Sequence, residues 1–137
     1  MTSNQGHDGG CHCGAVRFRT SGAPVHVALC HCSDYRRSAG APVVAWAAFK
    51  EADFSLLQGS MTAFNSSGAV TRSFCPACGT GLIYRNPEVL PGLVDVQLAT
   101  FDNPGALKPM AHIQTAEQIG WMATAHELPM FERFPGM

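Results

Sequence analysis

Charged side chains are scarce in this sequence. They make up 14% of its 137 residues, and the 9 Lys and Arg nearly balance the 10 Asp and Glu. The basic residues, such as Arg17, Arg36, Arg72 and Arg133, are scattered rather than gathered into a stripe, which argues against a nucleic-acid binder. Because hydrophobic residues reach 46%, the composition also excludes a disordered chain, and we expect a folded core.

Long apolar runs are missing as well. The longest run, from Ala41 to Phe49, has nine residues, about half of what a helix needs to span a bilayer. The first ten residues, MTSNQGHDGG, have neither the positive start nor the apolar stretch of a secretory signal. We therefore expect no membrane partner and a cytoplasmic location.

Sustained helical periodicity is also lacking, and short apolar segments between Gly and Pro predict a mainly β fold. A short helix is expected from Ser33 to Ser38, and the turn formers from Phe101 to Pro109 predict a surface loop. Strands are expected over eight segments, which are Val16 to Thr20, Val25 to Leu29, Val43 to Phe49, Met61 to Phe64, Val70 to Phe74, Leu82 to Arg85, Leu93 to Ala99 and His112 to Thr115.

Two expectations concern the chain as a whole. With 137 residues and no low-complexity linker, residues 1–137 are expected to form a single domain. The C-terminal segment LPMFERFPG, residues 128–136, carries two Pro and two Phe. We interpret it as an irregular tail that packs across the core.

Cysteine is the residue type that carries chemistry here, and the six cysteines form three close pairs. In a reducing compartment, clustered cysteines more often ligate metal or do chemistry than form disulfides. Zinc bound at about 2.3 Å from each sulfur needs sulfurs roughly 3.8 Å apart, which tight turns impose on thiols two or three residues apart. The pairs are Cys11 with Cys13, Cys30 with Cys32, and Cys75 with Cys78.

The first and third pairs are flanked by glycine, which favours such turns. Gly79 can adopt the positive φ that turns backbone N–H groups toward the sulfurs. We therefore predict one closed, structural zinc site with four thiolate ligands, whose metal contributes directly to folding. The ligands are Cys11, Cys13, Cys75 and Cys78.

The pair Cys30 and Cys32 has no second pair to complete it. A catalytic zinc keeps three protein ligands and one open position for water or substrate. Two thiolates are one ligand short of that set, so this pair indicates an open second site.

Four segments then resemble a known family: GGCHCGAVRF, LCHCSDYRRSAGAP, RSFCPACGTGLIY, and KPMAHIQT with the later Trp and LPMFERFPG. In this order they are similar to the glutathione-dependent formaldehyde-activating enzyme (GFA) family, which shares its domain with centromere protein V. The resemblance runs from about Gly9 to Gly136. It implies a β-tent of several small antiparallel sheets organised around a structural zinc, with one or two short helices.

The resemblance also implies an activity. Family members are zinc proteins with carbon–sulfur lyase activity, so it implies an enzyme that condenses formaldehyde with glutathione, or splits related adducts. It places the structural zinc on Cys11, Cys13, Cys75 and Cys78. It places the catalytic zinc on Cys30, Cys32 and the position of Tyr35.

Tyr35 departs from the family pattern, which has a cysteine there. A phenol has a pKa near about 10 against about 8.5 for a thiol and is a harder donor, so the exchange weakens zinc binding. Three outcomes are open: Tyr35 ligates as a phenolate, His31 or Asp34 substitutes, or the site is empty. We favour an empty or weakly occupied site, with His31 as a packing residue and Asp34 as a charge or cap at the start of the helix.

Two functions follow as rival hypotheses. The first is a zinc-dependent carbon–sulfur lyase whose small-molecule partner is an adduct of glutathione or another small thiol, with Cys30, Cys32 and Tyr35 as catalytic residues. The second is a zinc-stabilised binding or scaffold domain whose catalytic metal has been lost through Tyr35. Redox cycling of Cys30 with Cys32 is a weaker third idea, since a C-x-C disulfide closes a strained ring. Trp46 and His112 are candidates for a pocket, but we interpret both as core residues.

Overall fold

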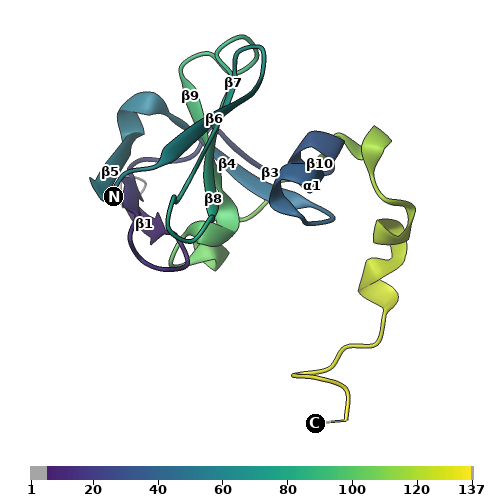
Figure 1. Ribbon diagram of the computed structural model, residues 1–137. Helices are drawn as coiled ribbons and strands as arrows, with labels where there is room; N and C mark the ends of the chain where they lie inside the picture. The colour runs from purple at the N-terminus through teal and green to yellow at the C-terminus, as the bar shows by residue number, and fades with distance from the viewer. Residues whose placement is uncertain (1–5, 137) are drawn as a thin grey trace.

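The computed structural model describes residues 6–136, and its strands form two sheets (Figure 1). The smaller sheet has the order β1-β2-β5, with antiparallel neighbours. Its strands are β1 (His7–Gly10), β2 (Arg17–Thr20) and β5 (Phe54–Gln58).

The larger sheet has the order β10-β3-β4-β9-β8-β7-β6. Its neighbours are antiparallel except for β10, which pairs with β3 in parallel. Its strands are β3 (His26–Cys30), β4 (Val44–Lys50), β6 (Thr62–Ser67), β7 (Val70–Phe74), β8 (Gly81–Arg85), β9 (Leu93–Gln97) and β10 (Ala111–Ile113).

One α-helix, α1 (Ser33–Ala39), follows β3 and ends at Gly40, whose φ of 64° lets the chain leave the helix in the left-handed conformation. The remaining helical turns in the described residues are short 3-10 segments. They are η1 (Glu51–Asp53), η2 (Leu98–Thr100), η3 (Pro104–Ala106), η4 (Thr115–Glu117) and η5 (Gly120–Glu127). None of these helices has the length and apolar character needed to cross a membrane.

The two faces of β4 supply two separate cores. Side chains alternate along a strand, so Phe49 points to one face and Trp46 to the other. Phe49 belongs to the main core, which joins the larger sheet to β2 of the smaller one through Val16 and Phe18. Trp46 belongs to a smaller cluster beneath α1, together with Tyr35.

The sequence-based prediction of a mainly β fold is confirmed, and so is the short helix, which extends one residue beyond the predicted end. Strands β1 and β5 were not predicted. Two of the four residues of β1 are glycines, which show no strand pattern in the sequence. Gly9 is needed for close packing, because a Cβ there would lie 2.5 Å from Cζ of Phe18 and 2.6 Å from the Thr100 carbonyl oxygen.

The prediction that the C-terminal segment packs across the core is wrong. Figure 1 shows the chain after β10 running away from the sheets to the C-terminus. Met130 is 92% exposed and Phe134 is 72% exposed. Neither core cluster contains a residue beyond Leu107, so the described core closes without this segment.

Candidate metal centre

Two loops bring four sulfur atoms together at one end of the molecule. The first loop joins β1 to β2 and carries Cys11 and Cys13, and the second joins β7 to β8 and carries Cys75 and Cys78. All four sulfurs lie within 4.8 Å of one another. The Sγ atoms of Cys11 and Cys13 are 3.6 Å apart, and those of Cys13 and Cys75 are 3.8 Å apart.

Backbone amides point at two of these sulfurs. Sγ of Cys75 accepts from the N–H groups of Ala77 and Cys78, at 3.3 and 3.5 Å, and Sγ of Cys11 accepts from the Val16 N–H at 3.2 Å. Gly79 closes the second turn with a φ of 83°, as its position predicted. N–H groups aimed at sulfur stabilise the thiolate form, which is the form that binds metal.

Thr80 links the two loops. Its hydroxyl oxygen accepts from the His12 N–H at 3.1 Å and lies 3.1 Å from Sγ of Cys78. Hydrogen bonds from the Thr80 hydroxyl and from the Thr80 backbone lower the pKa of the Cys78 thiol to about 5. No local pattern predicts this role for Thr80, because its contact is with His12, 68 residues earlier in the chain.

The donor set fits a metal ion. Without a cation the thiols oppose one another's ionisation: the Ala15 amide lowers the pKa of Cys13, but the neighbouring thiols of Cys11 and Cys78 outweigh it and raise that pKa to about 11. A cation at the centre removes this conflict, since thiolates bound to a divalent ion stay deprotonated. The four cysteines can therefore hold a metal ion, and four thiolates are a set that suits zinc.

The second pair lies where β3 meets α1. Cys30 is buried, and burial raises the pKa of its thiol to about 12. Cys32 is half-buried and is the N-cap of α1, with its Sγ accepting from the Tyr35 N–H at 3.4 Å. The sequence suggested Asp34 for the charge or cap. Asp34 lies in the first turn as an acidic residue, but the capping side chain is Cys32.

Tyr35 packs among aromatic rings. Its ring centre lies 4.8 Å from that of Trp46 and 4.9 Å from that of Tyr84, and the Arg72 guanidinium lies 5.1 Å from it. Burial raises the pKa of the phenol above its ordinary value, so ionising Tyr35 to bind a cation costs more than ionising an exposed phenol. A neutral phenol is a poor ligand for a cation.

A second metal ion therefore does not fit these residues as they stand. The described residues hold one cluster of three or more His, Cys, Asp or Glu side chains with metal-ligand spacing, and it is the cluster of Cys11, Cys13, Cys75 and Cys78. Cys30 and Cys32 have no third such ligand within that spacing. Burial also opposes the ionisation of Tyr35.

His31 lies between the two cysteines and faces another histidine. It is 1% exposed, and its Nε2 is 2.9 Å from Nδ1 of His112 on β10. Its Nδ1 has no hydrogen-bond partner among the described residues. The expectation that His31 is a packing residue agrees with this position. His112 is exposed rather than part of the core.

Asp95 is a buried carboxyl group that the sequence reasoning missed. It lies on β9 opposite Ala48 and Tyr84 and is 3% exposed. Burial raises its pKa to about 7, and its Oδ1 has no hydrogen-bond partner in the described part of the chain. Alternation along β9 places Asp95 among the polar positions of the strand, so no local signal marks its carboxyl group as buried.

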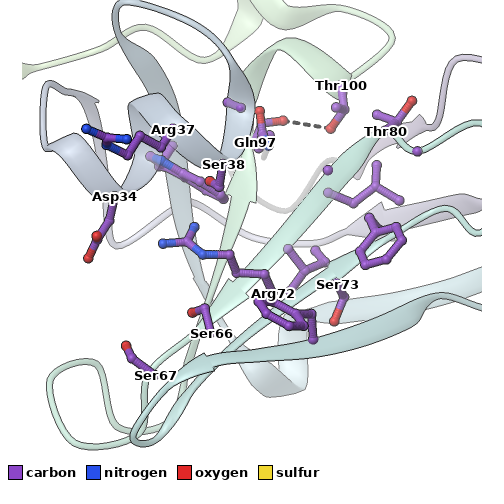
Figure 2. Close-up of a pocket in the computed structure, with 18 residues that line it drawn as sticks. Asp34, Arg37, Ser38, Ser66, Ser67, Arg72, Ser73, Thr80, Gln97 and Thr100 are labelled. Atoms are coloured by element: carbon purple, nitrogen blue, oxygen red, sulfur yellow. Dashed lines mark hydrogen bonds between the residues drawn. The ribbon is translucent and has the colours of Figure 1, made fainter.

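A cleft with a volume of about 840 Å³ lies between α1, the β6–β7 hairpin and the loop that carries Cys78. Figure 2 shows Arg72 reaching from β7 toward the helix residues, which include Arg37 and Ser38. Trp46 and Phe64 supply apolar surface, so Trp46 is both a core residue and a cleft residue. Cys30, Cys32 and Tyr35 do not line the cleft, although Asp34, two residues after Cys32, does.

Two comparisons with known proteins bear on this site. A family model described as glutathione-dependent formaldehyde-activating enzyme matches residues 6–117. A crystal structure of a Rhodobacter sphaeroides protein is similar with a TM-score of 0.61 and 24% sequence identity, and the match covers 77% of this chain and 98% of that chain. At this identity the structural likeness supports the fold alone.

Proposed function

Because this chain belongs to the glutathione-dependent formaldehyde-activating enzyme family, we propose that it is a zinc-dependent carbon–sulfur lyase. Its substrates are adducts of formaldehyde, or a related aldehyde, with glutathione or another small thiol. Residues 1–137 act as one domain in this proposal. The observation that carries it is the cleft beside α1, which combines two arginines with an aromatic wall.

The zinc of this proposal is structural. Cys11, Cys13, Cys75 and Cys78 would hold it, and the ion would neutralise the thiolates and tie the β1–β2 loop to the β7–β8 loop. Thr80 lies both at this cluster and on the wall of the cleft. The metal cluster therefore supports one wall of the proposed substrate site.

The cleft supplies groups that complement a small anionic peptide thiol. Glutathione carries two carboxylates and one ammonium group at neutral pH. Arg37 and Arg72 can pair with carboxylates, and Asp34 can pair with an ammonium group. Trp46 and Phe64 offer apolar surface for the rest of the molecule.

Catalysis in this proposal falls on Cys30, Cys32 and Tyr35, the residues that the family resemblance suggests. None of them lines the cleft, so the adduct has to reach Cys32 from Asp34, which is two residues along the chain and on the cleft wall. In splitting the adduct, the C–S bond breaks with its electron pair going to sulfur, the hydroxyl proton leaves as the carbonyl forms, and the sulfur gains a proton. Cys32 is half-buried beside Arg36 and Arg37 on α1, and we assign proton transfer to its thiol. Cys30 and Tyr35 are buried beneath and within α1 and stay protonated because burial raises both pKa values, so we assign them to positioning Cys32 rather than to contact with the adduct.

The test is turnover with the adduct of formaldehyde and glutathione, followed by NMR exchange spectroscopy. We expect the wild-type protein to accelerate exchange above the spontaneous rate. Arg72→Leu is expected to weaken binding about tenfold, which is the loss of one charged hydrogen bond worth about 1.5 kcal/mol. Arg19→Leu, which removes an arginine paired with Asp8 on the smaller sheet, is the matched control. No acceleration by the wild-type protein would refute the lyase.

A second function is favoured by Tyr35. Because this residue is neutral and packed, the chain can be a zinc-stabilised binding domain that holds a thiol adduct without cleaving it. Counting the metal ions bound per chain, in the wild type and in Tyr35→Cys, distinguishes the binding domain from the lyase. One ion per wild-type chain, glutathione binding without turnover, and a second ion with new turnover in Tyr35→Cys would establish the binding domain. Turnover by the wild type would establish the enzyme.

A further inference from the structure

The C-terminal arm, residues 118–136, carries large apolar side chains that its own body leaves uncovered. In Figure 1 it leaves the body next to α1 and β10 and extends away from both sheets. Five of its side chains are more than half exposed: Trp121, Leu128, Met130, Phe131 and Phe134. A contiguous apolar stretch of this kind marks an interaction surface.

The arm is fixed at its base, where Ile119 and Trp121 lie beside α1 residues, and beyond Trp121 it makes no hydrogen bond to the body in the described residues. Among the described residues, its hydrogen bonds reach no further than three positions along the chain. Just before it, β10 pairs with β3, the His31 N–H donates to the Ile113 carbonyl oxygen at 3.1 Å, and the Ser33 N–H donates to Glu117 Oε1 at 2.7 Å. These bonds set the direction in which the arm leaves.

The arm contributes no residue to either core cluster. The family model matches only to residue 117, so the resemblance expected over residues 118–136 is not covered by it. Apolar side chains in such a segment therefore do not serve the core of their own chain.

We propose that the arm docks on a second copy of this chain, in a reciprocal exchange about a two-fold axis. A groove of about 290 Å³ lies where the arm begins, lined by Ala41, Pro42, Ile119 and Trp121 together with two arginines of α1, Arg36 and Arg37. In a two-fold pair the two arms cross near their bases, so each groove faces the arm of the partner. An isologous interface of this kind closes on itself and leaves no arm uncovered.

Charge and area both favour this occupant. The arm carries Glu127 and Glu132 against one Arg133, and its net negative charge complements the two arginines of the groove. Beyond Trp121, which lines the groove itself, its four exposed side chains offer roughly 500 Å² at about 125 Å² each, below the roughly 150–250 Å² of a fully buried aromatic. Two arms and the two surfaces that receive them would bury roughly 2,000 Å², which exceeds the roughly 1,600 Å² of a standard stable interface.

The test is the mass of the full-length protein in solution, by sedimentation velocity from about 1 to 100 μM, a range in which an interface of this size associates. We expect a dimer for the wild type and a monomer for the triple variant Met130→Ser, Phe131→Ser, Phe134→Ser. Val89→Ser, which changes a side chain that is 70% exposed outside the arm, should remain dimeric. Circular dichroism and bound metal report whether each variant is folded.

A second measurement places the arm. In a mixture of isotope-labelled and unlabelled full-length chains, filtered NMR experiments should show contacts between arm aromatics of one chain and Pro42 of the other. A wild-type monomer over the whole range, a larger assembly, or a folded triple variant that stays dimeric would each overturn the proposal. So would a dimer without contacts between the arm and the groove. None of these outcomes depends on lyase activity.

Discussion

Asp95→Asn should change how the stability of this protein depends on pH. Asp95 is 3% exposed and faces the cluster under α1 without a partner for Oδ1 among the described residues. Burial raises its pKa from 3.8 to about 7. In the unfolded chain the carboxyl group is solvated and ionises at its ordinary value, so the folded state binds the proton more tightly.

The direction and the size of the pH effect on the free energy of unfolding follow from this difference in pKa. Between about pH 4 and pH 7 the native state holds a proton that the unfolded state has lost, so the free energy of unfolding falls as pH rises and levels off above pH 7. A gap of about three pH units corresponds to about 4 kcal/mol. Asn cannot ionise, so the unfolding free energy of the variant loses this pH dependence. The unfolding free energy of the variant minus that of wild type should therefore rise by about 2 to 3 kcal/mol from pH 5 to pH 8.

Urea unfolding followed by tryptophan fluorescence, at saturating zinc and at pH 5, 6, 7 and 8, measures this directly. Asp34→Asn is the control, because Asp34 is an exposed carboxylate at the start of α1. It should shift the unfolding free energy by about 0.5 kcal/mol or less. Parallel pH curves for wild type and Asp95→Asn would refute the reasoning, since they would mean that Asp95 is ionised at no cost in the folded protein.

Three further outcomes are expected. Phe49→Ala should lower the free energy of unfolding by about 3–5 kcal/mol in urea, because Phe49 is 0% exposed in the main core. Gly9→Ala should lower it by about 1–3 kcal/mol, because the added Cβ would overlap Phe18 and the Thr100 carbonyl; an unchanged midpoint would mean that β1 packs differently. Cys75→Ser should abolish metal retention and lower the melting temperature of the purified protein, since Cys75 is buried and its sulfur is one of four within 4.8 Å.

Much of the fold was predictable because period-two alternation and turn residues are local signals. Strand β7 was predicted with its observed bounds, Val70–Phe74, and α1 was predicted to within one residue at its end. Strand β1 was not, since a strand containing Gly9 and Gly10 has no side-chain pattern. Its existence depends on the close approach of Phe18 and Phe101, which no local signal encodes.

The candidate site likewise has one part that local sequence signals predict and one part that they do not. The four-sulfur cluster was predictable because the two cysteines of each pair lie two or three positions apart and glycine marks each turn. The cleft was not, because Arg72 and Arg37 belong to elements that meet only when α1 lies beside the larger sheet. The arm was mistaken for a packed tail because its Phe and Pro content predicts burial without saying which molecule supplies the surface.

X-ray absorption at the zinc edge, with metal counting on the same sample, tests the central claim that four thiolates hold one ion. We expect one zinc per chain with four sulfur neighbours at about 2.3 Å. The signal should be lost in Cys75→Ser. A shell dominated by nitrogen or oxygen, or zinc retained in full by Cys75→Ser, would contradict the account.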